Sequence, residues 1–406
     1  MRVFLMVLFG LIAIIINAQE SLFVRGNNAL KSSRYLSALN IFIEDEQSYT
    51  EKYPNYQLLS TLYSFVGEDS LAEQTFLKDF GKESNKLVDS VSIPENPKVV
   101  DALNYLESVI DTQRIVIVNE SHHKPKHRIF SYELLKVLKE KGFTHLALEA
   151  FFDSDNSFDN RGYPLVLENG FYSSEPVFGN LLRKAHELGF KIFGYDFSPP
   201  CNYYKDKPNY CQNIRELYQA SVIAKVIWQN PSAKVFVHCG HGHIMERTNN
   251  DRIFMAEKLK ILTGIDPLTI IQTNNSSNRL NYYYDAPLEN KPFVLLNNEE
   301  PYVQKNDEGF YDVPLIWPKT NYKYGRATYR FLPNDFKAYD LNENIEQGSF
   351  VQVYKENEGE GAVPTDQFIV KDSTINYHLS LPKGKFIVKI KNENDSLLES
   401  FNFVAD

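Results

Sequence analysis

Between residues 95 and 334, short apolar runs alternate with longer stretches whose apolar residues recur at helical spacing. The apolar runs are expected to be strands, at residues 115–118, 146–148, 192–194, 235–237 and 268–271. Two of the intervening stretches end at a glycine, Gly142 and Gly189, as helices commonly do. This alternation favours an α/β domain with a largely parallel sheet that helices cover on both faces.

Ionisable side chains follow four of these strands directly, and two short segments hold six of the nine histidines. In an open parallel sheet, the carboxyl ends of the strands meet at one edge, where ligands bind. Burying so many polar groups without partners would be costly, so we expect a functional site at that edge. The ionisable residues at the four strand ends are Glu120, His122, His123, Glu149, Asp196, His238, His241 and His243.

Two mechanisms suit these residue types. In the first, imidazoles and carboxylates hold a divalent metal, which lowers the pKa of a bound water. In the second, a histidine acts as general base on water, a glutamate such as Glu149 orients it, and a cation stabilises the oxyanion. The candidate cation is Arg215, on the helix that leads into the strand before His238; we expect it a few turns from the crevice.

The order of strand, N-E-S-H-H, helix and LALEA resembles the erythromycin esterase family over residues 110–275. It is also similar to ChaN-type haem-binding proteins, within a superfamily that includes the TIKI/TraB metal-dependent proteases. The FGYD segment that ends at Asp196 and the helix expected at 254–264 match the esterase pattern as well. Asn119 and Gly240 depart from it, because the family has Gly and His at these positions, so a macrolide substrate does not follow.

The resemblance implies catalytic roles for Glu120, Glu149, Arg215 and His243. The esterase pattern selects His123 as the base, whereas the ChaN pattern selects His122 and also matches His127, so both alternatives stay open. A metal, if used, would be held by Glu120, His122, His123, Glu149 and His243. Substrate contacts or supporting roles are expected for Asp196, His127, His238 and His241.

The function predicted is that of an exported hydrolase acting on an ester, amide or related bond of a small-molecule or peptide substrate. A haem- or metal-binding protein without turnover is the alternative. The net charge of −9 argues against nucleic acid as a partner.

Residues 1–18 have the pattern of a secretory signal peptide, with an apolar stretch too short to span a bilayer and a small residue, Ala18, at the expected cut. We therefore expect a periplasmic or extracellular protein without a transmembrane segment after cleavage. In an oxidising compartment, Cys201 and Cys211 are expected to pair and to leave Cys239 free.

Two further regions flank the α/β domain. Residues 19–94 are expected to form helices, and Ala38 and Phe42 recur 34 residues later, which is the tetratricopeptide period. These helices are expected to pack on their neighbour and are a candidate surface for a protein partner. Residues 335–406 are rich in β-forming runs separated by turns, which predicts a small antiparallel β-sandwich.

Overall fold

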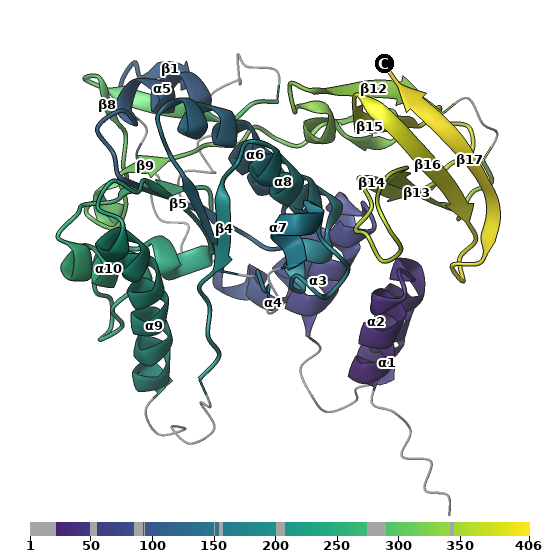
Figure 1. Ribbon diagram of the computed structural model, residues 1–406, viewed down its shortest axis with the longest axis horizontal. Helices are drawn as coiled ribbons and strands as arrows, with labels where there is room; N and C mark the ends of the chain where they lie inside the picture. Colours follow the sequence, from purple (N-terminus) through teal and green to yellow (C-terminus); the bar gives the residue numbers. More distant parts are fainter. Residues whose placement is uncertain are drawn as a thin grey trace, which may run out of the picture.

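The computed structural model describes residues 22–48, 55–84, 92, 94–149, 151–153, 157–199, 208–273, 290–341 and 345–406. The expected signal peptide at 1–18 and Cys201 lie outside these residues. Within them, the chain has the predicted mixed α/β architecture (Figure 1). No helix of the described residues has the length and apolarity needed to cross a membrane.

The central sheet has six parallel strands in the order β4-β3-β5-β2-β6-β9. All five predicted strands are confirmed, and two of them run further than expected, to Glu120 and Gly240. The strands are β2 (Ile115–Glu120), β3 (His145–Leu148), β4 (Lys191–Gly194), β5 (Val235–Gly240), β6 (Leu268–Ile271) and β9 (Val313–Pro314).

Alternate side chains of each strand enter two separate cores, one on each face of the sheet. Val116 and Val118 of β2 pack into the core under the first group of helices, and Ile115 and Ile117 pack into the core under the second group. The first group is α5 (Ala102–Val109), α6 (Pro125–Glu140) and α8 (Pro176–Glu187), and the second is α9 (Pro208–Gln229) and α10 (Met255–Thr263).

The strand order opens a crevice at the carboxyl edge of the sheet. β5 lies between β2 and β3 although it follows both in the chain. The helices that follow β2 and β3 lie on one face, whereas α10, which follows β5, lies on the other. Neighbouring strands whose connections leave toward opposite faces form the crevice in which α/β proteins bind ligands.

The N-terminal region forms two helical hairpins, α1 with α2 and α3 with α4. Ala38 and Ala72, the pair 34 residues apart, are both fully buried. Helices α1–α3 share a core with Phe350 and Val363 of the C-terminal region, so this segment packs on its neighbours as expected. Binding of a protein partner here stays a prediction. The helices are α1 (Leu22–Lys31), α2 (Tyr35–Ser48), α3 (Tyr56–Phe65) and α4 (Asp69–Ser84).

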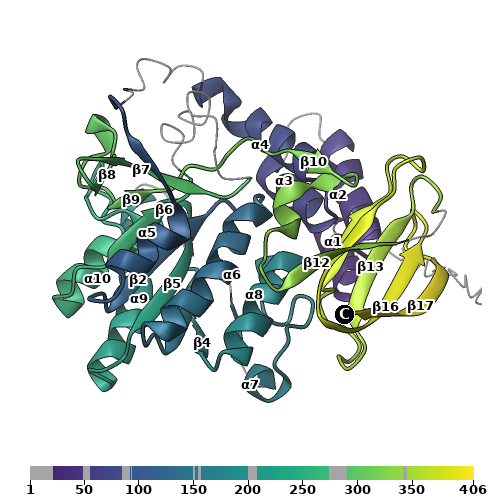
Figure 2. The same ribbon diagram turned by 90° about the horizontal axis from the view of Figure 1, so that it is seen from above.

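The C-terminal region contains a four-stranded antiparallel sheet, β14-β13-β16-β17, and the antiparallel pair β12-β15, which enclose one core. It lies on the opposite side of the molecule from α9 and α10 (Figure 2). The strands are β12 (Phe336–Asp340), β13 (Phe350–Lys355), β14 (Asp366–Ile369), β15 (His378–Pro382), β16 (Gly384–Lys391) and β17 (Leu397–Ala405).

Several small elements did not follow from the sequence pattern. A three-stranded sheet in the order β1-β7-β8 and the hairpin β10-β11 were not expected. They are β1 (Lys98–Asp101), β7 (Phe293–Asn297), β8 (Glu300–Pro301), β10 (Tyr322–Lys323) and β11 (Arg326–Ala327), with the short helix α7 (Ser157–Arg161) and the 3-10 turns η1 (Tyr172–Ser174), η3 (His241–Ile244), η5 (Lys305–Asp307) and η6 (Thr328–Phe331).

Candidate functional site

A cavity of about 380 Å³ lies in the crevice at the carboxyl edge of the sheet. Residues that follow β2, β3, β4 and β5 all reach it, together with side chains from α3, α9 and the segment before α10. The predicted convergence of the strand ends is therefore observed. The lining residues are Gln57, His122, Glu149, Tyr172, Asp196, Gln212, Arg215, Gly240, His241, Gly242, His243 and Arg252.

Glu120 is the last residue of β2 and lies just beneath the cavity. Arg128, one turn into α6, binds its carboxylate through Nε at 2.7 Å and Nη2 at 2.8 Å, and both side chains are almost fully buried. His238 Nε2 lies 2.9 Å from the same carboxylate. Burial alone would raise the pKa of Glu120, but the Arg128 charge and the hydrogen bonds from His122 and His238 hold that pKa well below its usual range.

His122 is held in one orientation at the cavity wall. Its Nδ1 lies 2.8 Å from Glu120 Oε1, and its ring stacks on Tyr172 with centroids 3.8 Å apart. Because Glu120 is ionised, Nδ1 carries the proton and donates it to the carboxylate. In the neutral ring Nε2 then has a free lone pair. Nε2 has no hydrogen-bond partner among the described residues, so it can accept from a molecule in the cavity.

The opposite wall carries a chain of ion pairs with alternating charge. Arg215 binds Asp196 with two hydrogen bonds, of 2.9 and 2.7 Å, and donates a third to Glu149 at 2.8 Å. His243 bridges Glu149 and Glu216, with its Nε2 at 3.2 Å from the first and its Nδ1 at 2.7 Å from the second. Arg252 completes the chain by donating to Glu216 at 2.6 Å.

His243 is a fixed cation in this chain. Burial would lower the pKa of His243, but its two carboxylate partners outweigh burial and raise that pKa to about 10. Burial would likewise raise the pKa of Glu149, yet the charge and hydrogen bond of His243 and the charge of Arg215 hold it well below its usual range. Glu149 is therefore an ionised, fully engaged group at neutral pH and is poorly suited to act as a base.

Gly240 allows the two walls to approach each other. A Cβ atom at this position would lie 2.7 Å from Cε1 and Nε2 of His122 and 3.0 Å from Oε2 of Glu149. The Gly240 amide donates to that same Glu149 oxygen at 2.5 Å. Any side chain here would push His122 out of place, which explains the glycine at this position.

The predicted histidines do not all reach the cavity. Of the two candidate bases, His122 lines it, whereas His123 stacks on Phe76 of α4 with centroids 3.9 Å apart. Burial lowers the pKa of His123 to about 2.

The other three predicted histidines also differ in position. His127 is buried and accepts a hydrogen bond from the Ser121 amide, and His238 bonds Ser131 and Glu120, so both lie beneath the cavity. His241 lines the cavity, and burial lowers its pKa to about 4.

Two details of the sequence-based prediction were wrong. Arg215 lies in the crevice and not a few turns away from it. The reason is that α9 runs back along the sheet before β5, so the first turns of α9 lie at the carboxyl edge. The carboxylate that contacts the candidate base His122 is Glu120, whereas Glu149 bonds Arg215 and His243.

Several site residues were missed because their sequence context is ordinary. Arg128 and Glu216 each lie within an amphipathic helix, where a charged residue predicts a solvent-facing position. Their complete burial shows that each is paired instead. Nothing in the local pattern marks Gln57, Tyr172, Gln212 or Arg252, which reach the cavity from α3, η1, α9 and the segment before α10.

The arrangement does not suit a metal or haem. Among the described residues, no group of three or more His, Cys, Asp or Glu side chains is placed to hold a metal ion. Both oxygens of Glu120 and of Glu149 and both nitrogens of His243 already have partners. Haem needs apolar surface for its macrocycle, but no aliphatic side chain is among the lining residues.

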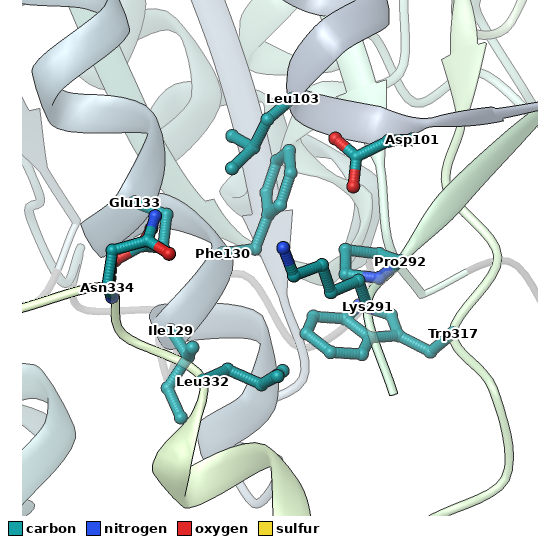
Figure 3. Close-up of a pocket in the computed structure, with 10 residues that line it drawn as sticks. All are labelled: Asp101, Leu103, Ile129, Phe130, Glu133, Lys291, Pro292, Trp317, Leu332 and Asn334. Atoms are coloured by element: carbon teal, nitrogen blue, oxygen red, sulfur yellow. Dashed lines mark hydrogen bonds between the residues drawn. The ribbon is translucent and has the colours of Figure 1, made fainter. Parts of the chain in front are cut away.

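A second cavity, of about 30 Å³, has room for about two water molecules. It lies beside α6, where Glu133 accepts the Asn334 amide at 3.0 Å (Figure 3). It does not adjoin the strand ends, so it takes no part in the site.

The structure describes two of the three cysteines. Cys211, in the first turn of α9, is disulfide-bonded, and Cys239 is free and buried in β5. The expected partner, Cys201, lies outside the described residues.

No family model and no curated protein matches the chain. Solved structures give only distant likeness. The type III effector HopBA1 matches with a TM-score of 0.33 and 15% identity, over 57% of this chain and 99% of that one. A structure described as bacterial protein toxins matches with a TM-score of 0.33 and 13% identity, over 64% and 57%. RRSP, a MARTX toxin effector domain from Vibrio vulnificus, matches with a TM-score of 0.32 and 14% identity, over 60% of this chain and 54% of that one. Scores this low carry no argument about function.

Proposed function

We propose that the protein is an exported hydrolase that cleaves an ester, amide or related bond with a water molecule activated by His122. The observation that carries the proposal is the Glu120–His122 pair. A buried, ionised carboxylate bonds Nδ1 of an imidazole whose Nε2 has no partner within the described part of the chain and lies at a cavity of about 380 Å³. A carboxylate that orients an imidazole in this way suits general-base catalysis.

In the proposed reaction, His122 Nε2 accepts a proton from water while the water oxygen attacks the carbonyl carbon. Negative charge then develops on the carbonyl oxygen. Nη1 of Arg215 suits this charge, because its one hydrogen-bond-distance partner among the described residues, His243 Nε2 at 3.4 Å, is protonated and cannot accept a hydrogen bond. Protonated His122 returns its proton to the leaving oxygen or nitrogen as the carbon–heteroatom bond breaks.

Export is the second part of the proposal. The disulfide of Cys211 supports it, because disulfides persist mainly in oxidising compartments. The expected signal peptide at residues 1–18 points the same way.

The test is a screen of ester and amide substrates with the wild-type protein and His122→Ala. We expect hydrolysis by the wild type and a loss of at least about a hundredfold in kcat/KM in the variant, the usual range for a general base. His186→Gln is the matched control, since His186 bonds a backbone carbonyl far from the cavity and should change nothing. Equal activity in His122→Ala and the wild type, with the far-ultraviolet spectrum preserved, would reject the proposal.

A further inference from the structure

The cavity has polar groups that the protein itself leaves unused. Gln57, Tyr172, Gln212 and Arg252 line it. The side-chain amides of the two glutamines, the hydroxyl of Tyr172 and Nη1 of Arg252 have no hydrogen-bond partner among the described residues. In a folded protein most polar groups at such positions are paired with protein or water. A set of unused groups around one cavity therefore suggests a polar ligand that bonds several of them.

Arg252 is the group that best defines this ligand, because its guanidinium is fixed before anything binds. Nη2 donates to Glu216 at 2.6 Å, and the guanidinium carbon lies 4.8 Å from the centre of the Phe254 ring. The side chain is 33% exposed, so the group remains accessible. A planar, pre-positioned guanidinium with a free nitrogen binds carboxylate and phosphate oxygens well.

The charges of the neighbouring groups favour an acceptor on the ligand. The oxygens of Asp196 and Glu149 already have hydrogen-bond or ion-pair partners, which are Arg215, Gln219, His243 and the Gly240 amide. Glu216 is shared by two cations, His243 and Arg252. The acceptors of this wall are therefore saturated, whereas Nη1 of Arg252 and Nη1 of Arg215 still have hydrogens to donate.

We propose that the substrate carries an anionic oxygen group, a carboxylate or a phosphate, that binds Arg252 while the scissile bond lies near His122. Gln212 and Gln57 then bond the polar atoms between these two points. The position of the scissile bond near His122 rests on the proposed function, but binding of an anion at Arg252 can be measured without turnover.

The experiment measures binding of inorganic phosphate and of N-acetylglycine by calorimetry at low ionic strength. N-acetylglycinamide is the neutral match to the carboxylate. We expect saturable binding of at least one anion and none of the amide, and the anion that binds identifies the group. In Arg252→Gln the affinity should fall roughly ten- to a hundredfold, as for a lost charge-assisted hydrogen bond.

Arg247→Gln is the matched control, because Arg247 lies over Phe310 outside the cavity lining and should leave binding unchanged. If the wild type binds neither anion, or if Arg252→Gln binds as tightly as the wild type, the inference is overturned. Binding without any hydrolysis would keep the anion site and reject the catalytic role instead.

A measurement on the wild type alone covers the case in which Arg252→Gln does not fold. The anion that binds should slow the modification of Arg252 by phenylglyoxal, read by mass spectrometry, and should leave Arg247 unprotected. Equal rates for Arg252 with and without the anion would count against the site.

Discussion

His243 shows how one residue can define the electrostatics of this site. It lies between two buried carboxylates, Glu149 and Glu216, and takes a bridging position of the kind that a metal ion occupies in metal-dependent hydrolases. Unlike a metal, the imidazolium contributes a single charge and uses both of its donors on the protein. Its role is therefore to keep the two carboxylates ionised.

The raised pKa of His243 predicts how its contribution to stability depends on pH. The pKa is about 10 in the folded protein and about 6.5 in an unfolded chain. The contribution is then fully present below about pH 6.5 and is lost as the pH rises through about 10. Denaturant unfolding of the wild type and of His243→Gln should give a gap in unfolding free energy that shrinks over this window. A gap that stays constant with pH would contradict the assignment.

At the scale of elements, the sequence predicted the strands well because their apolar runs are continuous and bounded by glycines and polar turns. It also predicted that the strand ends converge, since parallel strands share an edge. It could not predict that β5 lies between β2 and β3, because strand order depends on packing between distant segments. The pairing of Glu216 with His243, which follows β5, depends on that order, so the role of Glu216 was hidden as well.

The position of helix α4 could not be predicted from the sequence either, because nothing in its sequence indicates that it covers part of the site. Phe76 of α4 stacks on His123, and Glu73 binds Lys124 at 3.0 Å. The cover helps to explain why His123, although adjacent to His122, is neutral and withdrawn from the cavity. The N-terminal helices thus contribute to the site through α4 and through Gln57 of α3.

Phe76→Ala should uncover His123. Burial is the main cause that lowers the pKa of His123 to about 2, so removing the ring should raise that pKa toward the ordinary value of about 6.5. The measurement is the titration of the His123 ring proton by NMR. Leu77→Ala is the control, since Leu77 is the next residue of α4 and is 50% exposed. A His123 that still fails to titrate above about pH 4 in Phe76→Ala would show that α4 is not its cover.

At the scale of the whole molecule, the three regions do not behave as separate units in the described residues. The core of α1–α3 includes Val166 of the α/β region and Phe350 and Val363 of the C-terminal region. Buried ion pairs join the same regions: Arg183 binds Glu358 at 2.5 Å, and Arg330 binds Asp69 at 2.6 Å. Shared cores and shared ion pairs favour unfolding in one cooperative transition.

The Arg330–Asp69 pair tests this cooperativity, because it joins α4 to the segment that leads into the C-terminal sheets. Both side chains are at most 6% exposed, so Arg330→Gln would leave a buried, unpaired carboxylate. We expect a loss of about 3–5 kcal/mol in unfolding free energy. Lys98→Gln breaks an exposed pair with Glu299 and should have little effect, since water already screens both charges. The measurement is denaturant unfolding of the wild type and of both variants. If Arg330→Gln unfolds in two steps or matches Lys98→Gln, the regions are independent, because an ion pair between independently folded parts stabilises neither of them.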